Sequence, residues 1–427
     1  MRSETRLPRV VVIGAGFGGL RVAQRLRHAP IDVLVIDRLN HHTFMPLLYE
    51  VATAGLSADD IAQPVRAILR GARSVRFLLA EVTRIDLDGR RVVTDVCSVR
   101  YDYLVIAAGT VTNYFGMASV EQNAIGLKNL SQANAIRSRI LRNFEHATVE
   151  RDGDERSRLM TMVVVGGGPT GVEMAGALAE LKRHVLRRDF PALDLSESRV
   201  ILLEATDRLL PAMPTGLQRK AHDQLRALGV DVRLGALVTD VSEGAVTLRS
   251  GETIASSNIV WVTGTRGEPM AASLGLELAP GGRVPVENTL QLAGYPEAFA
   301  IGDITVLEGP DGRPYPMLAQ VALQQGDLAA RNILHAAGGE PPLRFHYRNR
   351  GTMATVGRHM AVAHIFGLQF SGFPAWVLWL VVHLLAIVGL RNRALVVLNW
   401  TWNYFRYDRA NRLVTDEVSR VKEPFSD

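Results

Sequence analysis

Short apolar runs alternate with segments of helical spacing along most of the chain. Residues 9–13 form a run rich in β-branched residues, which predicts a strand. The segment after it places three apolar side chains on one helical face, those of Leu20, Ala23 and Leu26. A second strand is predicted over residues 32–36 and leads into Asp37. A strand, a helix and a further strand in this order predict a parallel βαβ unit.

The same order of elements recurs in the middle of the chain. Residues 161–165 form another β-branched run, a helical segment follows, and residues 198–203 form a strand that ends at Glu204. These two strands lie further apart than those of the first unit, so we expect an insertion near residues 187–191. The repeat predicts an α/β fold with two Rossmann-like dinucleotide-binding domains.

The closing strands of the two units indicate how the units are connected. Residues 103–109 read as a strand followed by glycine, and residues 258–264 repeat that pattern. A further strand, residues 298–301, follows the second unit, so we predict that the second domain is inserted in the first. The expected domains are residues 1–115 with 295–345, residues 116–294, and a C-terminal helical region, residues 346–427.

A G-x-G-x-x-G pattern follows the first strand of each unit, at residues 14–19 and 166–171. The first glycine permits a tight turn, the second lets the main chain approach a pyrophosphate, and the third lets the helix pack close to the strand. The phosphates then meet free N–H groups at the positive end of the helix. One such pattern is a weak signal, but two in this context predict two dinucleotides and electron transfer between them.

Each glycine pattern is followed by an acid at the end of the next strand, Asp37 and Glu204 respectively. A carboxylate at this place can accept hydrogen bonds from ribose hydroxyls. Glu204 would also repel a 2′-phosphate, so we expect a preference for NADH over NADPH. Arg208 lies close enough in the sequence to weaken that preference.

The composition removes several kinds of chemistry. Cys97 is the only cysteine, so the chain has no redox-active cysteine pair, and a cysteine-based zinc site is not expected. We expect Cys97 to be a small packed side chain in an alternating segment, residues 91–99. No metal site is expected, because His41 and His42 lack further ligands. The first nine residues are polar, so no signal peptide is expected.

The C-terminal region differs from the rest of the chain in hydropathy and charge. Residues 374–390 are apolar apart from His383, a stretch that is marginal for a membrane span. Four of the five tryptophans lie between residues 376 and 402, and residues 340–412 carry nine arginines against two acids. Because tryptophan favours the headgroup level and arginine is attracted to anionic lipid, we expect interfacial helices over residues 373–409. A dimer interface is the alternative, and both can hold.

Three segments resemble a known family. Residues 41–55 are similar to the loop after the second strand in type II NADH:quinone oxidoreductases, and residues 319–325 are similar to the A-Q-x-x-x-Q helix of their quinone site. Residues 299–303 resemble a segment of the wider superfamily of flavoproteins with two dinucleotide-binding domains. The resemblance covers nearly the whole chain and implies FAD on the first domain and NADH on the second.

The resemblance also implies which residues contact each cofactor. FAD, bound without a covalent link, would be held by Gly14, Gly16, Phe17, Gly18, Gly19, Asp37, Arg38, Val82, Ala108, Gly109, Asp303, Ala319 and Gln320. NADH, as substrate, would be held by Gly166, Gly168, Pro169, Thr170, Gly171, Glu173, Glu204 and Gly264.

Three residues are expected to be catalytic: Glu173, Gln320 and Gln324. We place Glu173 in the first turn of its helix, where its family counterpart lies near the nicotinamide and the flavin. Gln320 and Gln324 are four residues apart and share a helix face, from which neutral amides can bond quinone carbonyls. Solvent-facing glutamines are the alternative.

These features predict an oxidoreductase that passes a hydride from NADH to FAD and two electrons to a membrane quinone, without pumping protons. We expect a peripheral enzyme on the cytoplasmic side of the cell membrane, bound to anionic lipid and homodimeric. The lone cysteine argues against a sulfide:quinone or disulfide reductase. A soluble reductase of the same fold and a non-catalytic NADH-binding membrane protein are the remaining alternatives.

Overall fold

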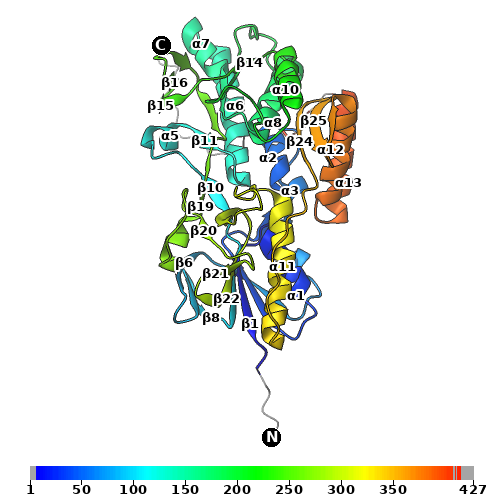
Figure 1. Cartoon of the computed structure of the whole chain (residues 1–427). Coiled ribbons are helices and arrows are strands. Elements are labelled where there is room, and N and C mark those ends of the chain that lie inside the picture. The colour runs from blue at the N-terminus through cyan, green and yellow to red at the C-terminus, as the bar shows by residue number, and fades with distance from the viewer. Residues whose placement is uncertain (1–5, 407–408, 410, 415–427) are drawn as a thin grey trace. The chain divides into compact units, whose positions relative to one another are not determined.

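The computed structural model describes residues 6–406, 409 and 411–414, which divide into two compact units (Figure 1). Within these residues, unit 1 comprises 6–43, 62–113 and 265–350, and unit 2 comprises 44–61, 114–264 and the segment from 351 onward. The main differences from the domain ranges that the sequence indicates are that residues 265–294 belong to unit 1, that residues 44–61 belong to unit 2, and that the segment from residue 351 onward is part of unit 2.

A six-stranded sheet with the order β21-β22-β9-β1-β2-β5 forms the centre of unit 1. Its strands are parallel except for β21. Their bounds are β1 (Arg9–Ile13), β2 (Asp32–Asp37), β5 (Val75–Leu79), β9 (Tyr103–Ile106), β21 (Gln291–Leu292) and β22 (Tyr295–Ala300). The strand predicted near residues 298–301 therefore lies beside β9, which completes the first domain after the second has been inserted.

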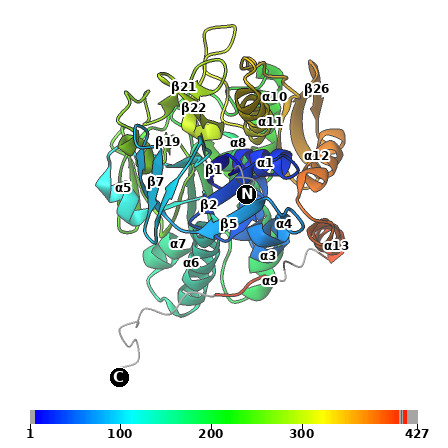
Figure 2. The ribbon, with the colours of Figure 1, turned by 90° about the horizontal axis from the view of Figure 1, so that it is seen from below.

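Two helices cover one face of this sheet, α1 (Phe17–Leu26) and α11 (Ala319–Gly338), and they lie side by side (Figure 1 and Figure 2). Leu20, Ala23 and Leu26 are buried, as their helical spacing predicts. The opposite face packs against a small antiparallel sheet and a 3-10 segment. The sheet consists of β6 (Val82–Asp86), β7 (Arg91–Thr94) and β8 (Ser98–Arg100), and the 3-10 segment is η3 (Pro269–Leu274).

The remaining elements of unit 1 are short: β3 (His41–Thr43), β4 (Ala62–Pro64), α4 (Val65–Ile68), β10 (Thr110–Thr112), β19 (Thr265–Gly267), β20 (Val284–Pro285), η4 (Gly302–Ile304) and β23 (Thr305–Val306).

The position of Cys97 differs from the expectation. We expected a packed side chain within a continuous strand, but Cys97 is exposed in the turn between β7 and β8. Thr94 closes this turn, because its amide donates to the Cys97 carbonyl (2.8 Å) and its hydroxyl accepts from the Cys97 amide (3.0 Å). Because a turn separates the two strands here, Cys97 does not point alternately into the core as a residue within one continuous strand would.

Unit 2 has its own parallel sheet, with the order β11-β18-β12-β13-β14. The bounds are β11 (Ile125–Gly126), β12 (Met162–Val165), β13 (Val200–Leu203), β14 (Val230–Arg233) and β18 (Asn258–Trp261). Every residue of β12, β13 and β18 is buried, as expected for a parallel sheet that is covered on both faces. One of these faces packs against the antiparallel strands of residues 238–255.

Before its C-terminal part, unit 2 has the following helices: η1 (Met45–Leu47), α2 (Leu48–Ala52), α3 (Ala58–Ile61), α5 (Ala118–Asn123), α6 (Leu130–Val149), α7 (Gly153–Met160), α8 (Pro169–Glu180), the π-helical η2 (Leu181–Leu186), α9 (Arg187–Asp189) and α10 (Thr215–Ala227). A second antiparallel sheet consists of β15 (Val238–Ser242), β16 (Ala245–Leu248) and β17 (Thr253–Ala255). The insertion expected near residues 187–191 is thus a π-helical continuation of α8 followed by a loop.

The C-terminal part of unit 2 is a three-stranded meander followed by two helices. Its elements are β24 (Thr352–Gly357), β25 (Met360–Ile365), β26 (Leu368–Ser371), α12 (Phe373–Ala386) and α13 (Leu390–Arg406). β24 packs against α8 so closely that a methyl group on Gly176 would collide with the carbonyl of Val356. Among the described helices, none is long and apolar enough to cross a membrane.

Candidate functional site

The first glycine turn lies between β1 and α1, at the carboxyl end of the unit 1 sheet. A Cβ atom on Gly14 would collide with the carbonyl of Ala107, and one on Gly19 would collide with the carbonyl of Gly14. Gly16 is different, because no atom lies within 4 Å of its Cβ position. Packing therefore requires glycine at two positions, and the third opens onto space beside the helix N-terminus, where a pyrophosphate fits.

The carboxylate of Asp37 lies at this turn. One oxygen accepts from the amide of Ala15 (2.6 Å) and the other from the amide of Leu39 (2.7 Å). These two bonds fix the carboxylate at the end of β2, next to the position that a ribose occupies in folds of this type. The geometry at Gly16 and Asp37 therefore fits FAD.

Other residues expected to contact FAD also belong to unit 1. Arg38 forms an ion pair of 2.6 Å with Glu268. Burial raises the pKa of Glu268, and the charge of Arg38 offsets only part of that rise. Gly109 has a φ of 73° and no atom within 4 Å of its Cβ position. Ala108 directly precedes it after β9, and Val82 is the first residue of β6.

Asp303 lies in η4, directly after β22, as the sequence predicts. The preceding amide, that of Gly302, donates to the side chain of Gln325 at 2.6 Å, and Gln325 is buried. Gln325 therefore fixes the turn that presents Asp303. We did not single it out from the sequence, although it follows the two glutamines of the A-Q-x-x-x-Q segment.

Ala319 begins α11, and Gln320 and Gln324 lie on one face of it. The Oε1 atom of Gln320 accepts from the amide of Arg350 at 3.1 Å. Gln324 accepts from the amide of Arg348 at 2.9 Å and donates to the carbonyl of the same residue at 3.0 Å. Both side chains therefore hold the main chain at residues 348–350, so a quinone contact by Gln324 would replace one of these bonds.

The second glycine turn repeats the geometry of the first in unit 2. A Cβ atom on Gly166 would lie 2.9 Å from the amide nitrogen of Thr263, and one on Gly171 would collide with the carbonyl of Gly166. Gly168 has no atom within 4 Å of its Cβ position, and it is the N-cap of α8. Pro169 and Thr170 are the first residues of that helix. This turn therefore fits a second dinucleotide pyrophosphate.

The Glu204 carboxylate is fixed at this turn, one residue after β13. One oxygen accepts from the amide of Gly167 at 2.6 Å, and the other accepts from the amide and the hydroxyl of Thr206, each at 2.8 Å. Arg208 forms an ion pair with Asp207 at 2.7 Å. Its charge is therefore partly neutralised locally. Gly264, in a left-handed conformation with a φ of 71°, follows the closing strand β18.

Glu173 is buried in the second turn of α8, not in the first turn as we expected, because the helix begins at Pro169. Its Oε1 atom lies 3.4 Å from the amide of Thr355, which donates to it. Burial raises the pKa of Glu173 to about 8, and this amide opposes the shift only in part. The carboxyl is therefore protonated at neutral pH and can supply a proton.

Glu173 lines a cavity of about 450 Å³ within unit 2. The wall is formed by α2, α8, β24, α12, α13 and the segment that follows α13. Most of its side chains are apolar or aromatic, among them Trp376, Trp379 and Trp400. An apolar cavity with a few polar groups is typical of a site for a small organic ligand.

A second buried acid, Glu50, lines the same cavity. The indole N–H of Trp400 donates to both of its oxygens, at 3.1 and 3.3 Å. Burial raises the pKa of Glu50 to about 7, while Arg409 and Trp400 lower it. Arg409 donates to the Thr53 carbonyl at 2.7 Å and pairs with Glu180 at 3.3 Å. Sequence reasoning missed this group because its members lie on segments far apart in the chain.

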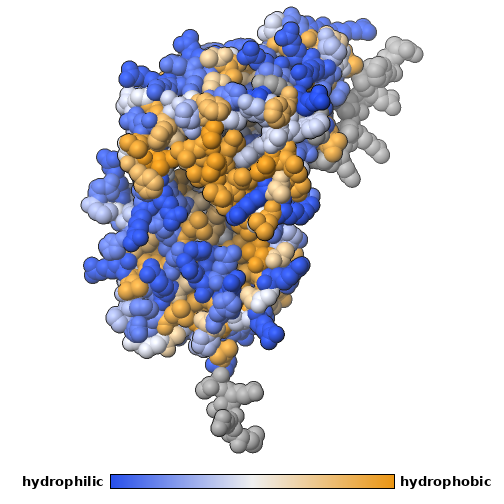
Figure 3. Space-filling model, turned by 90° about the vertical axis from the view of Figure 1, so that its right-hand side faces the viewer, coloured by the Kyte–Doolittle hydropathy of each residue, from blue (hydrophilic) through white to orange (hydrophobic). Residues whose placement is uncertain are grey.

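Apolar side chains gather in one patch on the face that carries α12 and α13 (Figure 3). Its most exposed members include Leu390 (82%), Phe366 (80%) and Phe405 (74%). The other exposed apolar residues of this segment are Leu368, Phe373, Val377, Val381, Val382, Leu385, Val397, Leu398 and Trp402. The opposite side of α12 is anchored in unit 2 by Ala375 and Trp379, which are buried.

The histidines considered from the sequence have structural contacts. His383 stacks on Trp379 with ring centroids 4.1 Å apart, and Nδ1 lies 2.8 Å from the carbonyl of the same residue. Burial lowers the pKa of His383 to about 4, so it is neutral. His42 is buried with its Nδ1 atom 3.1 Å from the carbonyl of Ala15. Among the described residues, no cluster of three or more histidine, cysteine or acidic side chains could hold a metal ion.

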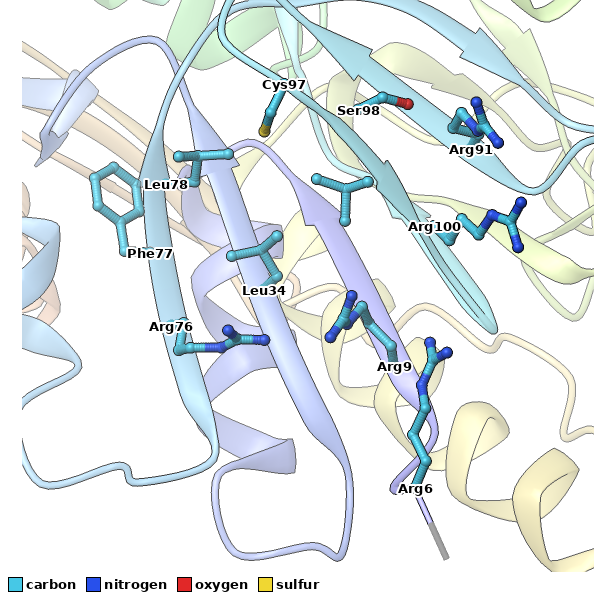
Figure 4. Close-up of a pocket in the computed structure, with 11 residues that line it drawn as sticks. Arg6, Arg9, Leu34, Arg76, Phe77, Leu78, Arg91, Cys97, Ser98 and Arg100 are labelled. Carbon is cyan, nitrogen blue, oxygen red and sulfur yellow. The ribbon is translucent and has the colours of Figure 1, made fainter.

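A hollow in unit 1 is lined by five arginines: Arg6, Arg9, Arg76, Arg91 and Arg100 (Figure 4). Two of them share one acid, because Asp32 accepts from Arg9 at 2.9 Å and from Arg76 at 2.8 Å. Arg9 and Asp32 begin their strands, so this hollow lies at the amino end of the sheet. Folds of this type bind cofactors at the carboxyl end, where the glycine turn lies.

Two family models match the chain. The model of the pyridine nucleotide-disulphide oxidoreductases matches residues 8–326, and the model of the NDH2 C-terminal domain matches residues 349–406. The chain is similar to the type II NADH:quinone oxidoreductase Ndh of Mycobacterium tuberculosis, with 41% identity, 96% of this chain covered and 91% of the relative. It is also similar to NdhA of that organism, with 40% identity and coverage of 96% and 90%.

Solved structures share the fold. The NDH2 structure from Plasmodium falciparum in complex with NADH has a TM-score of 0.89, at 19% identity, over 96% of this chain and 100% of that one. The sulfide:quinone oxidoreductase of Aquifex aeolicus has a TM-score of 0.73, at 19% identity, over 93% and 95% of the two chains.

Proposed function

This chain belongs to the type II NADH:quinone oxidoreductase family, and we propose that its two glycine turns hold FAD and NADH for the reduction of a membrane quinone. The enzyme is an FAD-dependent NADH dehydrogenase that does not pump protons. One observation carries the assignment of sites: each turn has two glycines required by packing and a third, Gly16 or Gly168, that opens onto space at a helix N-terminus.

Unit 1 would hold the resident cofactor. The pyrophosphate would approach Gly16 and the N-terminus of α1, with the Asp37 carboxylate facing a ribose. Asp303, presented by the bond between Gln325 and Gly302, would accept from hydroxyls further along the cofactor. When bound, FAD accepts a hydride from NADH and passes two electrons to the quinone.

Unit 2 would hold NADH. Gly168 and the N-terminus of α8 would receive its pyrophosphate, and Glu204 would accept from the ribose 2′-hydroxyl. The Glu204 carboxylate is already fixed by Gly167 and Thr206, so it would lie close to a 2′-phosphate. Repulsion between the two negative groups would disfavour the binding of NADPH.

Glu173 would supply a proton for quinone reduction. It is buried, protonated at neutral pH, and lines a cavity that suits an apolar ring and part of a hydrocarbon tail. Gln320 and Gln324 would bond the quinone carbonyls only after exchanging their bonds to residues 348–350.

The apolar patch on α12 and α13 supports attachment to a membrane surface. An exposed patch of this kind marks an interaction site, and its exposed Trp402, with the neighbouring arginines, fits the lipid interface. We propose a peripheral enzyme on the cytoplasmic side, held through residues 373–409 by anionic lipid, and a homodimer in solution. Flotation with vesicles and light scattering of the extracted protein test these two points separately.

Stopped-flow spectroscopy of the purified holoenzyme tests the function. NADH alone should bleach the flavin absorbance, and a quinone added next should restore it. Failure of the first step contradicts the assignment of the two dinucleotides. Bleaching by NADH without re-oxidation by any quinone would instead indicate a soluble reductase of the same fold.

A further inference from the structure

Two buried acids of different helices line the cavity of unit 2. Glu50 lies on α2, Glu173 lies on α8, and these two helices pack against each other. Both side chains contribute to the wall of the same cavity. The charge of Glu50 acts on Glu173 through this poorly solvated space and raises its pKa.

Glu50 is bound by neutral donors. The indole of Trp400 donates to both of its oxygens, and the hydroxyl of Tyr49 lies 3.4 Å from Oε1. Arg409 instead makes its ion pair with Glu180, and its remaining bonds go to the carbonyls of Thr53 and Ala177. The hydrogen bonds of Glu50 thus come from neutral groups, while the nearby charge of Arg409 stabilises the carboxylate and offsets its charge only in part.

The stoichiometry of the reaction requires a proton carrier. Reduction of a quinone to a quinol takes up two electrons and two protons. Oxidation of NADH supplies both electrons and one hydrogen nucleus, as hydride, so one more proton must enter from the medium in each turnover. Under the proposed function, Glu173 holds that proton.

We propose that Glu50 is a positioning residue for this proton: its negative charge, held by Trp400 beside the same cavity, keeps the proton on Glu173 until a quinone accepts it. The inference rests on the proposed function of Glu173. Once Glu173 has given up its proton, the two carboxylates repel each other, and this repulsion favours uptake of the next proton from the medium.

The charged groups around the pair agree with this assignment. On α8, Glu173 and Glu180 face the cavity together with His184 of η2. From the C-terminal segments, Arg358 and Arg409 face it, and His383 stacks on the cavity residue Trp379. From α2, Tyr49 and Glu50 face it. Burial raises the pKa of both Glu50 and Glu173, the charge of Glu50 raises the pKa of Glu173 further, and the charge of Glu180 raises that of Glu50.

The decisive experiment is the pH profile of quinone reduction in the holoenzyme. Glu50→Gln removes the neighbouring charge, so Glu173 should lose its proton at lower pH. The alkaline limb of kcat with a soluble quinone should then move to lower pH by roughly one unit. Glu50→Asp keeps the charge and should leave the limb close to its wild-type position. Glu121→Gln, on the exposed face of α5, is the matched control and should leave the profile unchanged.

Two readouts separate this inference from the proposed function. Flavin reduction by NADH alone, followed by stopped-flow spectroscopy, should keep its wild-type rate in Glu50→Gln. If the wild-type enzyme fails to reduce quinone, the proposed function is wrong. If it reduces quinone but the limb is in the same place in Glu50→Gln, the inference is overturned.

Trp400→Phe covers the case in which Glu50→Gln does not fold. Loss of the indole N–H favours the protonated form of Glu50, because the bond from Trp400 stabilises the carboxylate. The alkaline limb should then move in the same direction as in Glu50→Gln and by a smaller amount. A limb that stays in place, or moves to higher pH, would count against the coupling of the two acids.

Discussion

The Glu204 carboxylate has three donors from its own unit, and this fixes its direction before any nucleotide arrives. Glu204→Gln keeps the shape and one acceptor but removes the charge that a 2′-phosphate would meet. We expect the ratio of kcat/KM for NADH over NADPH to fall by about tenfold, the equivalent of ~1.4 kcal/mol. Steady-state kinetics with both nucleotides measure this ratio. An unchanged ratio would show that Glu204 does not read the 2′ position.

Gly176 is required by packing between α8 and β24. An added methyl group would collide with the carbonyl of Val356, and a main-chain carbonyl in a strand cannot move away freely. Gly176→Ala should therefore lower the free energy of unfolding by roughly 1–3 kcal/mol. Gly338→Ala is the control, because that helical glycine has no atom within 4 Å of its Cβ position. Thermal unfolding of the two variants should move the midpoint down only in the first.

Glu173 should make the protein less stable as pH rises. Burial raises its pKa to about 8 in the folded chain, so between its unfolded pKa and pH 8 the folded state binds more protons than the unfolded state. The free energy of unfolding is then greatest at the low-pH end of this window and falls by roughly 2–4 kcal/mol as the pH rises to 8. Glu173→Gln cannot ionise, so its unfolding midpoint should fall less between pH 5 and pH 8 than that of the wild type. Equal slopes would contradict the assignment of a buried, protonated acid.

The residues that the sequence identifies and those that it misses differ in a physical way. Asp37 and Glu204 are recognisable because each ends a strand that follows a glycine turn, and this local order fixes their place. Glu50 and Arg409 have no such local signal. Their surroundings are set by Trp400 and Glu180, which are 350 and 229 residues away respectively. Only tertiary packing brings these partners together.

At the scale of elements, α12 and α13 combine an anchored side with an exposed side. Trp379 packs inside unit 2, whereas Leu385 and Leu398 are 62% and 64% exposed. Removing both helices would open the core, so charged substitutions on the exposed side test membrane binding more cleanly. Leu385→Glu with Leu398→Glu should abolish flotation with vesicles and leave flavin reduction by NADH intact.

A matched substitution controls for added charge in that test. Val149, at the end of α6, is 65% exposed and lies outside the apolar patch. Val149→Glu should float with vesicles like the wild type. Flotation of the double variant at the wild-type level would exclude the patch as the membrane contact.

Elements were predictable where the apolar run is continuous and buried on both faces. The parallel strands β1, β9, β12 and β18 lie where the sequence places them, within a few residues. Residues 44–61 were not predictable, because their helices are too short to show a helical spacing of apolar residues. Their place in unit 2 depends on packing against α6 and α8. The turn at Cys97 was missed because alternation continues across it.

At the scale of the whole molecule, the charge is divided unequally along the chain. Residues 340–412 carry a net charge of +7, whereas the whole chain carries +5, so the remainder is slightly negative. An attraction to anionic lipid would then act on the segment that bears the apolar patch and would orient it toward the surface. The charge alone would give weak attachment, and the patch alone would give attachment without preference for lipid charge.

The two contributions can be separated by ionic strength. Binding to vesicles that contain anionic lipid should weaken as salt rises from roughly 0.05 to 0.5 M, because the Debye length falls to less than half over this range. At high salt the affinity should level off at the value for neutral vesicles. Arg391→Gln, on the exposed first turn of α13, should lower binding to anionic vesicles at low salt only. Arg344→Gln, an exposed arginine of unit 1, is its control. If both variants bind alike at every salt concentration, the arginines of α13 do not face the lipid, and the patch alone must account for attachment.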